Sequence, residues 1–187
     1  MKYFLPIFFS LTFVFLFMFG ISCVYGVIFP LKYQEEIAVS SENFGVDPVL
    51  IASVIKSESG FNKDIVSSKG AVGLMQLLPT TAEYLAKKLN YGEYDLYDVS
   101  DNINLGTYYL SLLLDEFADE ENALCAYNAG PTNVKNWLNN EEYSSDGKTL
   151  KIIPFKETEN YVNKCEQAKK YYKTKRSYFV VEWCYHF

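Results

Sequence analysis

The stretch DPVLIASVIKSESG, residues 47–60, decides how the chain is expected to fold. Asp47 followed by Pro48 is typical of a helix start, because aspartate caps a helix N-terminus and proline fits its first turn. The residues that follow are mostly apolar, and the helix is expected to stop near Gly60. The stretch therefore predicts a helix that is packed into a hydrophobic core.

One carboxyl interrupts the apolar pattern of this helix. Ile51, Val54 and Ile55 lie seven, four and three residues before Glu58, which places its carboxyl on the same stripe as the apolar side chains. Burial disfavours the charged form, and would raise the pKa of a glutamate from ~4.3 towards the ~6–7 that suits proton donation near neutrality. Glu58 is therefore a candidate general acid. The alternative is a half-exposed, inert glutamate at a helix end.

Outward from this helix, the remaining patterns also favour helices. Apolar residues recur at helical spacing, and sustained alternation of apolar and polar residues is missing; residues 151–153 and 178–181 are the only strand-like fragments. The sequence therefore predicts an all-α domain. The further helices are expected at about residues 31–44, 79–89, 101–117, 121–129, 133–138 and 157–173.

The N-terminus has a different character. From Phe4 to Phe29 there is no charged side chain, and the run is long enough to cross a hydrocarbon core of about 30 Å as a helix. Lys2 and the amino terminus precede it, which favours an exported remainder. We predict a membrane anchor at residues 1–29 and one domain at residues 30–187, held outside the cytoplasmic membrane by a single pass. A cleaved signal peptide, or a lipoprotein signal that uses Cys23, is the alternative.

Charge excludes one class of partner. The 187 residues carry 17 basic and 23 acidic side chains, a net charge of −6, and nothing basic lies between Lys88 and Lys135. Such a surface repels phosphate backbones, so nucleic-acid binding is not expected.

Cysteine and histidine do not predict a metal site. The four cysteines have no CxxC spacing, and the one histidine is His186. Cys184 with His186 could form a nucleophile pair, but no third partner is recognisable. Cys125 and Cys165 lie among apolar neighbours and are expected to be small core residues, although an exported domain would also permit a disulfide.

Four ordered motifs give the domain a family resemblance. After the glutamate helix come a glycine-bearing loop, a short helix that ends in Asn-Ala-Gly, and an acidic start to the last helix. The chain resembles the SLT-domain lytic transglycosylases of peptidoglycan, whose fold is similar to goose-type lysozyme. The motifs are ESGF at 58–61, GAVGLMQ at 70–76, AYNAG at 126–130 and ETENYV at 157–162. One departure is minor: Leu78 stands where relatives often carry Met.

The resemblance implies a role for seven residues. Glu58 would be the sole catalytic acid/base, and no metal or organic cofactor would be required. The substrate, peptidoglycan glycan strands, would be held by Ser67, Gln76, Tyr127, Asn128, Glu157 and Tyr161.

The substrate-binding residues also have structural alternatives. Ser67 could be a cap or loop residue, and Gln76 could cap the helix that begins at Pro79. Tyr127 could be ordinary core, and Asn128 could simply end a helix. Glu157 could stabilise a helix N-terminus as a first-turn acid.

A single carboxyl suffices if the substrate supplies its own nucleophile, whereas glycosidases ordinarily use two. The resemblance thus implies non-hydrolytic cleavage of the bond between N-acetylmuramic acid and N-acetylglucosamine, with a 1,6-anhydromuramyl product. A lysozyme-like muramidase that delivers water is the nearest alternative. A non-catalytic peptidoglycan-binding module is the alternative from another class.

Overall fold

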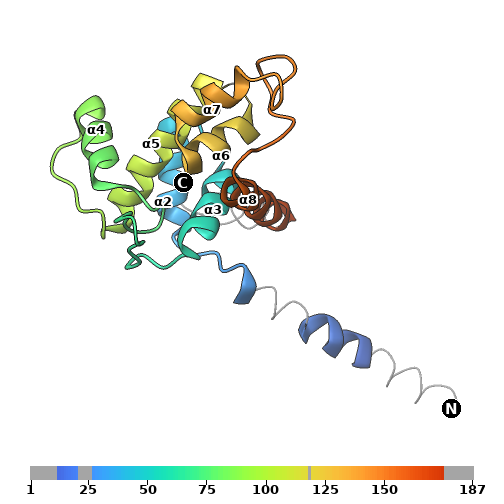
Figure 1. Ribbon diagram of the computed structural model, residues 1–187. Coiled ribbons are helices and arrows are strands. Elements are labelled where there is room, and N and C mark those ends of the chain that lie inside the picture. Colours follow the sequence, from blue (N-terminus) through green and yellow to red (C-terminus); the bar gives the residue numbers. More distant parts are fainter. Residues whose placement is uncertain (1–11, 21–26, 118, 175–187) are drawn as a thin grey trace, which may run out of the picture. The chain divides into compact units, whose positions relative to one another are not determined.

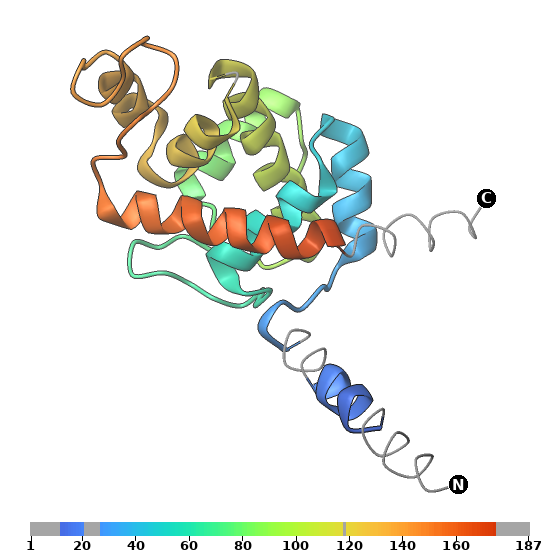
Figure 2. The ribbon, with the colours of Figure 1, turned by 90° about the vertical axis from the view of Figure 1, so that its right-hand side faces the viewer.

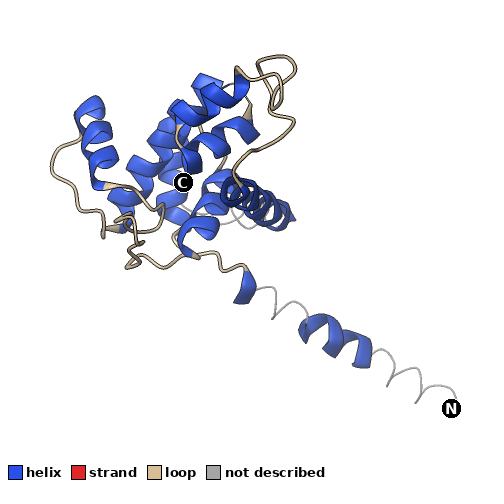
Figure 3. Ribbon diagram, viewed as in Figure 1, coloured by secondary structure: helices blue, strands red, loops and turns tan. Residues whose placement is uncertain are grey.

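The computed structural model describes residues 12–20, 27–117 and 119–174, and confirms the all-α prediction for this part of the chain (Figure 3). No strand occurs among these residues; two isolated bridges join Val72 to Val66 and to Leu77. The strand-like fragment at 151–153 is coil, and the one at 178–181 lies outside the described residues.

The chain divides into two units, residues 1–31 and 32–187. In the first unit, residues 12–20 are helical. Among the residues that the structure describes, no helix combines the length and the apolar character needed to span a membrane. Residues 1–11 and 21–26 of the predicted anchor lie outside the described ranges.

The described part of the second unit is built from helices joined by loops (Figure 1). In chain order they are α2 (Gln34–Phe44), α3 (Pro48–Ser59), α4 (Pro79–Leu89), α5 (Val99–Phe117), α6 (Glu120–Ala129), α7 (Pro131–Leu138) and α8 (Lys156–Thr174).

Helix α3 forms as its sequence predicts, but it is more deeply buried. The Asp47 side chain accepts a hydrogen bond from the Val49 amide at 2.9 Å, and Gly60 ends the helix at φ 60°. Every residue from Val49 to Ile55 is buried, so no face of this half of the helix meets water. The predicted apolar stripe is therefore part of a central helix, and only the last turn approaches the surface.

Helices α8 and α2 pack against α3, and α8 places the last turn of α3. Helix α8 packs against α3, which it crosses in Figure 2, and also contacts α6. Helix α5 packs against α2, α4 and α6. The C-terminal end of α3 is thus close to α8, which matters for the site.

Helix boundaries differ from the predictions by a few residues. Helix α2 begins at Gln34, because Tyr33 takes the left-handed conformation at φ 58°. Helix α7 begins at Pro131, since proline serves as its first residue.

The prediction for Cys125 and Cys165 is confirmed, because both are buried and neither forms a disulfide. Cys23, Cys184 and His186 lie outside the described residues.

Candidate active site

Glu58 lies in the last turn of α3 and is partly buried. Burial raises the pKa of its carboxyl from the ordinary 4.5 to about 7, and the nearby Tyr161 hydroxyl opposes this by a smaller amount. The shift has the direction expected from the sequence. At neutral pH a large fraction of Glu58 therefore carries a proton that it can donate.

Helix α8 supplies two buried neighbours of Glu58 that are one turn apart. Tyr161 is 6% exposed, and its hydroxyl makes no hydrogen bond of ordinary geometry. Cys165 is fully buried, and burial raises the pKa of its thiol to about 12. Burial, followed by the charge of Glu58, also raises the pKa of Tyr161 well above its usual range. Both groups therefore stay neutral beside the carboxyl.

The end of α6 supplies Tyr127 and Asn128. The Tyr127 hydroxyl donates to the Met75 carbonyl at 2.8 Å, and its ring packs against that of Tyr109, with centroids 5.2 Å apart. Burial raises the pKa of Tyr127 well above 10, and the charge of Glu58 adds to the effect. The Asn128 side-chain oxygen accepts from Thr158 of α8 at 2.9 Å. Helices α6 and α8 thus place Tyr127 and Tyr161 near Glu58.

Ser67 lies in the loop after α3 and closes a tight turn. Its hydroxyl accepts from the Ala71 amide at 3.0 Å, and its own amide donates to the Ala71 carbonyl at 2.9 Å. The turn contains Gly70 at φ 80°, a conformation that glycine adopts without strain. These contacts give Ser67 a structural role in the loop.

Gln76 lies at the far end of the same loop in an unusual conformation. Its φ is 48°, and its side-chain amide donates to the Gly73 carbonyl at 2.9 Å and to the Ile65 carbonyl at 3.2 Å. It does not cap α4, whose N-cap Leu78 forms no side-chain cap bond. Gln76 therefore braces the loop through its nitrogen and keeps its side-chain oxygen available.

Glu157 lies one turn before Tyr161 on α8 but, unlike Tyr161, is exposed. It is in the first turn of α8, its side chain is 76% exposed, and its nearest cation is Lys69 at 3.9 Å. This is the position expected of a first-turn acid, and it is also open to a ligand that reaches α8 from solvent.

Two residues that the sequence did not single out hold the site together. Asn102 of α5 is 1% exposed and accepts from the Met75 amide at 2.8 Å, so it anchors the loop that carries Gln76. Nothing in the local pattern separates Asn102 from Asn104, which is only half-buried. The Met75 carbonyl, which accepts a hydrogen bond from Tyr127, is a backbone group, so its role cannot be predicted from the residue type.

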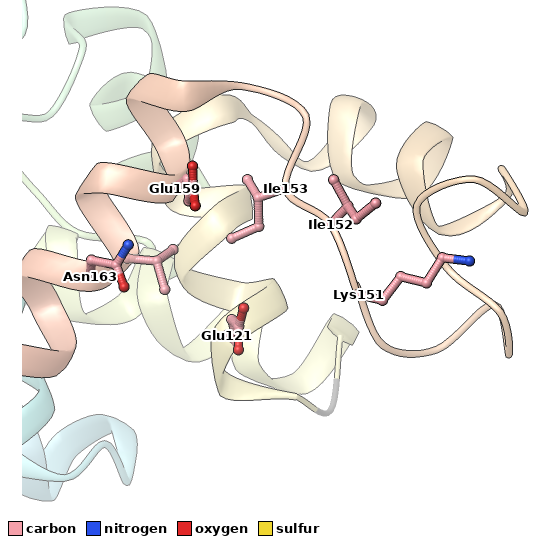
Figure 4. A pocket seen from close by; sticks show the side chains of 7 residues that line it. Glu121, Lys151, Ile152, Ile153, Glu159 and Asn163 are labelled. Atoms are coloured by element: carbon pink, nitrogen blue, oxygen red, sulfur yellow. The ribbon is translucent and has the colours of Figure 1, made fainter.

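A pocket of about 340 Å³ lies elsewhere, between the first turn of α6 and α8 (Figure 4). It includes none of the residues proposed for the site. Its lining consists of Glu121, Lys151, Ile152, Ile153, Glu159, Val162 and Asn163. In residues 12–20, 27–117 and 119–174, no three His, Cys, Asp or Glu side chains are grouped so that they could hold a metal ion.

The relatives described below, found by comparison with known proteins, are all named transglycosylases. Residues 35–150 match the family described as the transglycosylase SLT domain. The "soluble lytic murein transglycosylase" of Salmonella typhimurium is 32% identical over 151 residues, in an alignment that covers 78% of this chain and 23% of that protein. The "transglycosylase" of Enterobacteria phage PRD1 is 39% identical over 123 residues, 66% of this chain and 43% of that one. "Membrane-bound lytic murein transglycosylase C" of Actinobacillus pleuropneumoniae is 30% identical over 166 residues, 75% of this chain and 46% of that one.

Solved structures agree with the sequence relatives. An inactive mutant of the lytic transglycosylase Slt from Pseudomonas aeruginosa superposes with a TM-score of 0.71 at 30% identity, over 80% of this chain and 25% of that one. A complex of a 70-kDa soluble lytic transglycosylase with bulgecin A gives 0.71 at 29% identity, over 79% of this chain and 25% of that one. The chain thus spans about a quarter of the length of these larger proteins. On the family match and the shared helical fold, this chain belongs to the transglycosylase SLT domain family.

Proposed function

We propose that the chain is a peptidoglycan lytic transglycosylase that cleaves the β-1,4 bond between N-acetylmuramic acid and N-acetylglucosamine. The observation that carries the proposal is Glu58, a partly buried carboxyl with a pKa of about 7 in a chain of the SLT family. The names of its relatives, soluble and membrane-bound lytic murein transglycosylases, support the substrate class.

In the first step, protonated Glu58 donates its proton to the glycosidic oxygen, and the bond from that oxygen to C1 of the muramyl sugar breaks. Burial supports this role, because it keeps the carboxyl protonated until the leaving oxygen needs the proton. The N-acetylglucosamine end leaves as an alcohol. The 2-acetamido oxygen of the muramyl sugar stabilises the positive charge that develops at C1.

In the second step, the Glu58 carboxylate accepts the proton of the muramyl C6 hydroxyl as that oxygen bonds to C1. The carboxyl regains the proton it gave, and the product is a 1,6-anhydromuramyl end without consumption of water. One carboxyl acts as acid and then as base, so no second acid is needed. The neutral groups Tyr127, Tyr161 and Cys165 surround it with low polarity, which favours return to the protonated state.

The remaining site residues are proposed to bind the substrate. Tyr161 has a buried hydroxyl that lies near the Glu58 carboxyl and makes no hydrogen bond of ordinary geometry, which suits a contact with a sugar or with the reacting carboxyl. Asn128 uses its oxygen for Thr158 and keeps its amide nitrogen for a substrate acceptor. Gln76 keeps its side-chain oxygen for a substrate donor. Tyr127, Ser67 and Glu157 complete the set.

We further propose that residues 1–29 anchor the domain to the outer face of the cytoplasmic membrane. The support is the uncharged run from Phe4 to Phe29, together with a relative named as membrane-bound. Washing of membranes with carbonate and sequencing of the amino terminus tests this. Release of the protein, or a terminus near Cys23, would contradict an uncleaved anchor.

Digestion of purified peptidoglycan in water enriched in oxygen-18, followed by mass spectrometry, tests the proposed activity. We expect products lighter than the hydrolytic products by the mass of one water, without oxygen-18 at the new muramyl end. Labelled reducing ends would identify a muramidase instead. Binding of peptidoglycan without cleavage would identify a binding module.

A further inference from the structure

Asn102 is a fully buried asparagine whose side chain makes three hydrogen bonds, all to backbone groups outside its own helix. Its oxygen accepts from the Met75 amide at 2.8 Å. Its nitrogen donates to the Val72 carbonyl at 3.0 Å and to the Leu96 carbonyl at 2.9 Å. A buried polar group of this kind is retained only where its partners are well placed, because an unmade bond would be costly.

The segment that Asn102 holds is a strained turn from Val72 to Leu77. Gly73 has φ 80° and Gln76 has φ 48°, although left-handed backbone is uncommon for a residue other than glycine. The fit is close: a Cβ atom on Gly73 would lie 2.2 Å from the Asn102 nitrogen. Such a turn persists only when its surroundings hold it, and Asn102 binds it on both sides of Gly73.

The Met75 peptide is the point where this clamp reaches the site. Its N–H is bound by Asn102, and its carbonyl accepts from the Tyr127 hydroxyl at 2.8 Å. The Met75 side chain is fully buried and lies so close to α5 that a Cβ atom on Gly106 would come within 2.5 Å of its sulfur. Met75 therefore has little freedom to move towards or away from Tyr127.

We propose that Asn102 is a positioning residue for the reaction: it fixes the Met75 carbonyl, which holds the Tyr127 hydroxyl in place beside Glu58. This inference rests on the proposed function for its effect on turnover. Its geometric part, the control of Tyr127 through Met75, can be tested without any substrate.

Asparagine is the side chain that this position requires. Asn102→Asp keeps the shape and can still accept from the Met75 amide, but its ionised form turns an acceptor towards the Val72 and Leu96 carbonyls. Asn102→Ala removes all three bonds. Asn102→Asp therefore disturbs the loop less than Asn102→Ala does. If the alanine variant does not fold, the aspartate variant still allows the test.

Asn122 of α6 provides a matched control. It too is a fully buried asparagine that holds a loop, because its nitrogen donates to the Lys148 carbonyl at 2.6 Å. That loop contains none of the residues proposed for the site. Asn122→Ala should therefore lower the melting temperature in a similar way without disturbing Tyr127.

The first readout is turnover of peptidoglycan at a temperature where circular dichroism shows every variant of the full chain to be folded. We expect both Asn102 variants to lower kcat several-fold to about tenfold, as Tyr127→Phe does, with KM changed less than about twofold, because misplaced groups affect the transition state most. Asn122→Ala should keep kcat within about twofold. The double variant Asn102→Asp, Tyr127→Phe should lose little more than the worse single variant, since both act through one contact.

The second readout is the NMR signal of Tyr127 in protein labelled at the tyrosine ring carbon that bears the hydroxyl, assigned with Tyr127→Phe. Asn102→Asp should shift this signal towards that of a solvent-exposed tyrosine, and Asn122→Ala should leave it unchanged. If the wild type does not cleave peptidoglycan but the signal shifts as expected, the proposed function is wrong and the positioning role stands. An unchanged signal or strictly additive kcat losses would overturn the positioning role, as would failure of both Asn102 variants to fold.

Discussion

Two loops of the domain are each held by a buried asparagine, yet they are held to different degrees. The first loop, residues 60–78, is bound by Asn102 at two backbone groups, the Val72 carbonyl and the Met75 amide, and by Tyr127 at a third. The second loop, residues 139–155, receives one bond from Asn122, whose side-chain oxygen has no partner in the structure. The loop that carries Ser67 and Gln76 is thus the more firmly fixed of the two.

The second loop is instead stabilised from within. The Asp146 carboxylate accepts from the amides of Lys148 and Thr149, both at 2.8 Å, and from the Thr149 hydroxyl at 2.9 Å. These bonds hold the pKa of Asp146 well below its usual range. A loop that supports itself can change without affecting distant residues. A loop that depends on α5 and α6 transmits any change to Glu58, so the two loops should respond differently to substitution.

The largest expected effect is at Glu58, which lies two residues before the first loop. Glu58→Gln should abolish turnover while the fold is retained, because the amide is nearly isosteric but cannot donate and recover a proton; a general acid/base contributes about 10²–10⁴-fold. Activity on peptidoglycan measures this. Glu121→Gln is the matched control, since burial raises the pKa of that glutamate too, outside the site. Equal activity of the two variants would contradict the assignment.

The same substitution should stabilise the protein at high pH. The folded pKa of Glu58 is raised, so the folded state binds more protons than the unfolded state between pH 4.5 and about 7, and stability falls as the pH rises through this window. Above it, Glu58→Gln should gain up to about 3 kcal/mol in the free energy of unfolding, and almost nothing below pH 4.5. Urea denaturation at pH 4 and pH 8 measures the difference. A gain of the same size at both pH values would show that burial of the charge is not the cause.

A smaller effect is expected where the first loop meets α6. Tyr127→Phe leaves the Met75 carbonyl without its donor, which should cost about 1–3 kcal/mol of stability and lower kcat several-fold to tenfold. Thermal denaturation and kcat measure the two effects. Tyr143→Phe in the second loop is the control, because Tyr143 makes its hydrogen bonds in the structure through its backbone. If Tyr127→Phe keeps full activity, Tyr127 is only a core residue.

A still smaller effect is expected at Glu157, which pairs with Lys69 of the first loop. Both side chains are more than 75% exposed, so the ion pair itself contributes little. If Glu157 binds substrate, Glu157→Gln should raise KM about three- to tenfold by loss of a hydrogen bond, with kcat unchanged. Lys69→Ala removes the ion pair alone and should leave KM within about twofold. Equal KM values for the two variants would mean that Glu157 serves only the helix terminus.

The smallest effect on activity is expected in the second loop. Asp146→Asn should leave turnover unchanged but lower the melting temperature at pH 7. Because the folded pKa of Asp146 is lowered, its stabilisation is present above the ordinary value of 3.8 and is lost as the pH falls below it. The difference from wild type should therefore shrink between pH 7 and pH 3 in thermal scans. A lower kcat in this variant would show that the second loop communicates with the site after all.

Local signals predicted the helices well. Asp47 with Pro48 begins α3, and Gly45 and Gly60 end helices in the left-handed conformation, because each of these effects depends on neighbouring residues only. The same holds for the position of Glu58 in the last turn. The pKa of Glu58 followed from its apolar neighbours, since burial is its largest cause.

The spacing of residues in the sequence did not predict the long-range contacts. Asn102 binds Val72, 30 residues away, and Tyr127 binds Met75, 52 residues away, so no spacing rule connects them. Burial of α3 on all sides depends on where the other helices pack. The roles of Ser67 and Gln76 in bracing the first loop depend on backbone angles that only the folded chain displays.

The central claim is that Glu58 must be protonated to start the reaction, and the pH dependence of kcat/KM tests it most directly. The groups beside it, Tyr127, Tyr161 and Cys165, have raised pKa values and stay neutral in this range. We expect kcat/KM on peptidoglycan to fall about tenfold per pH unit above a break close to pH 7, which is the pKa of the free enzyme's acid. A break near pH 4.5, or activity that rises through neutrality, would contradict the account.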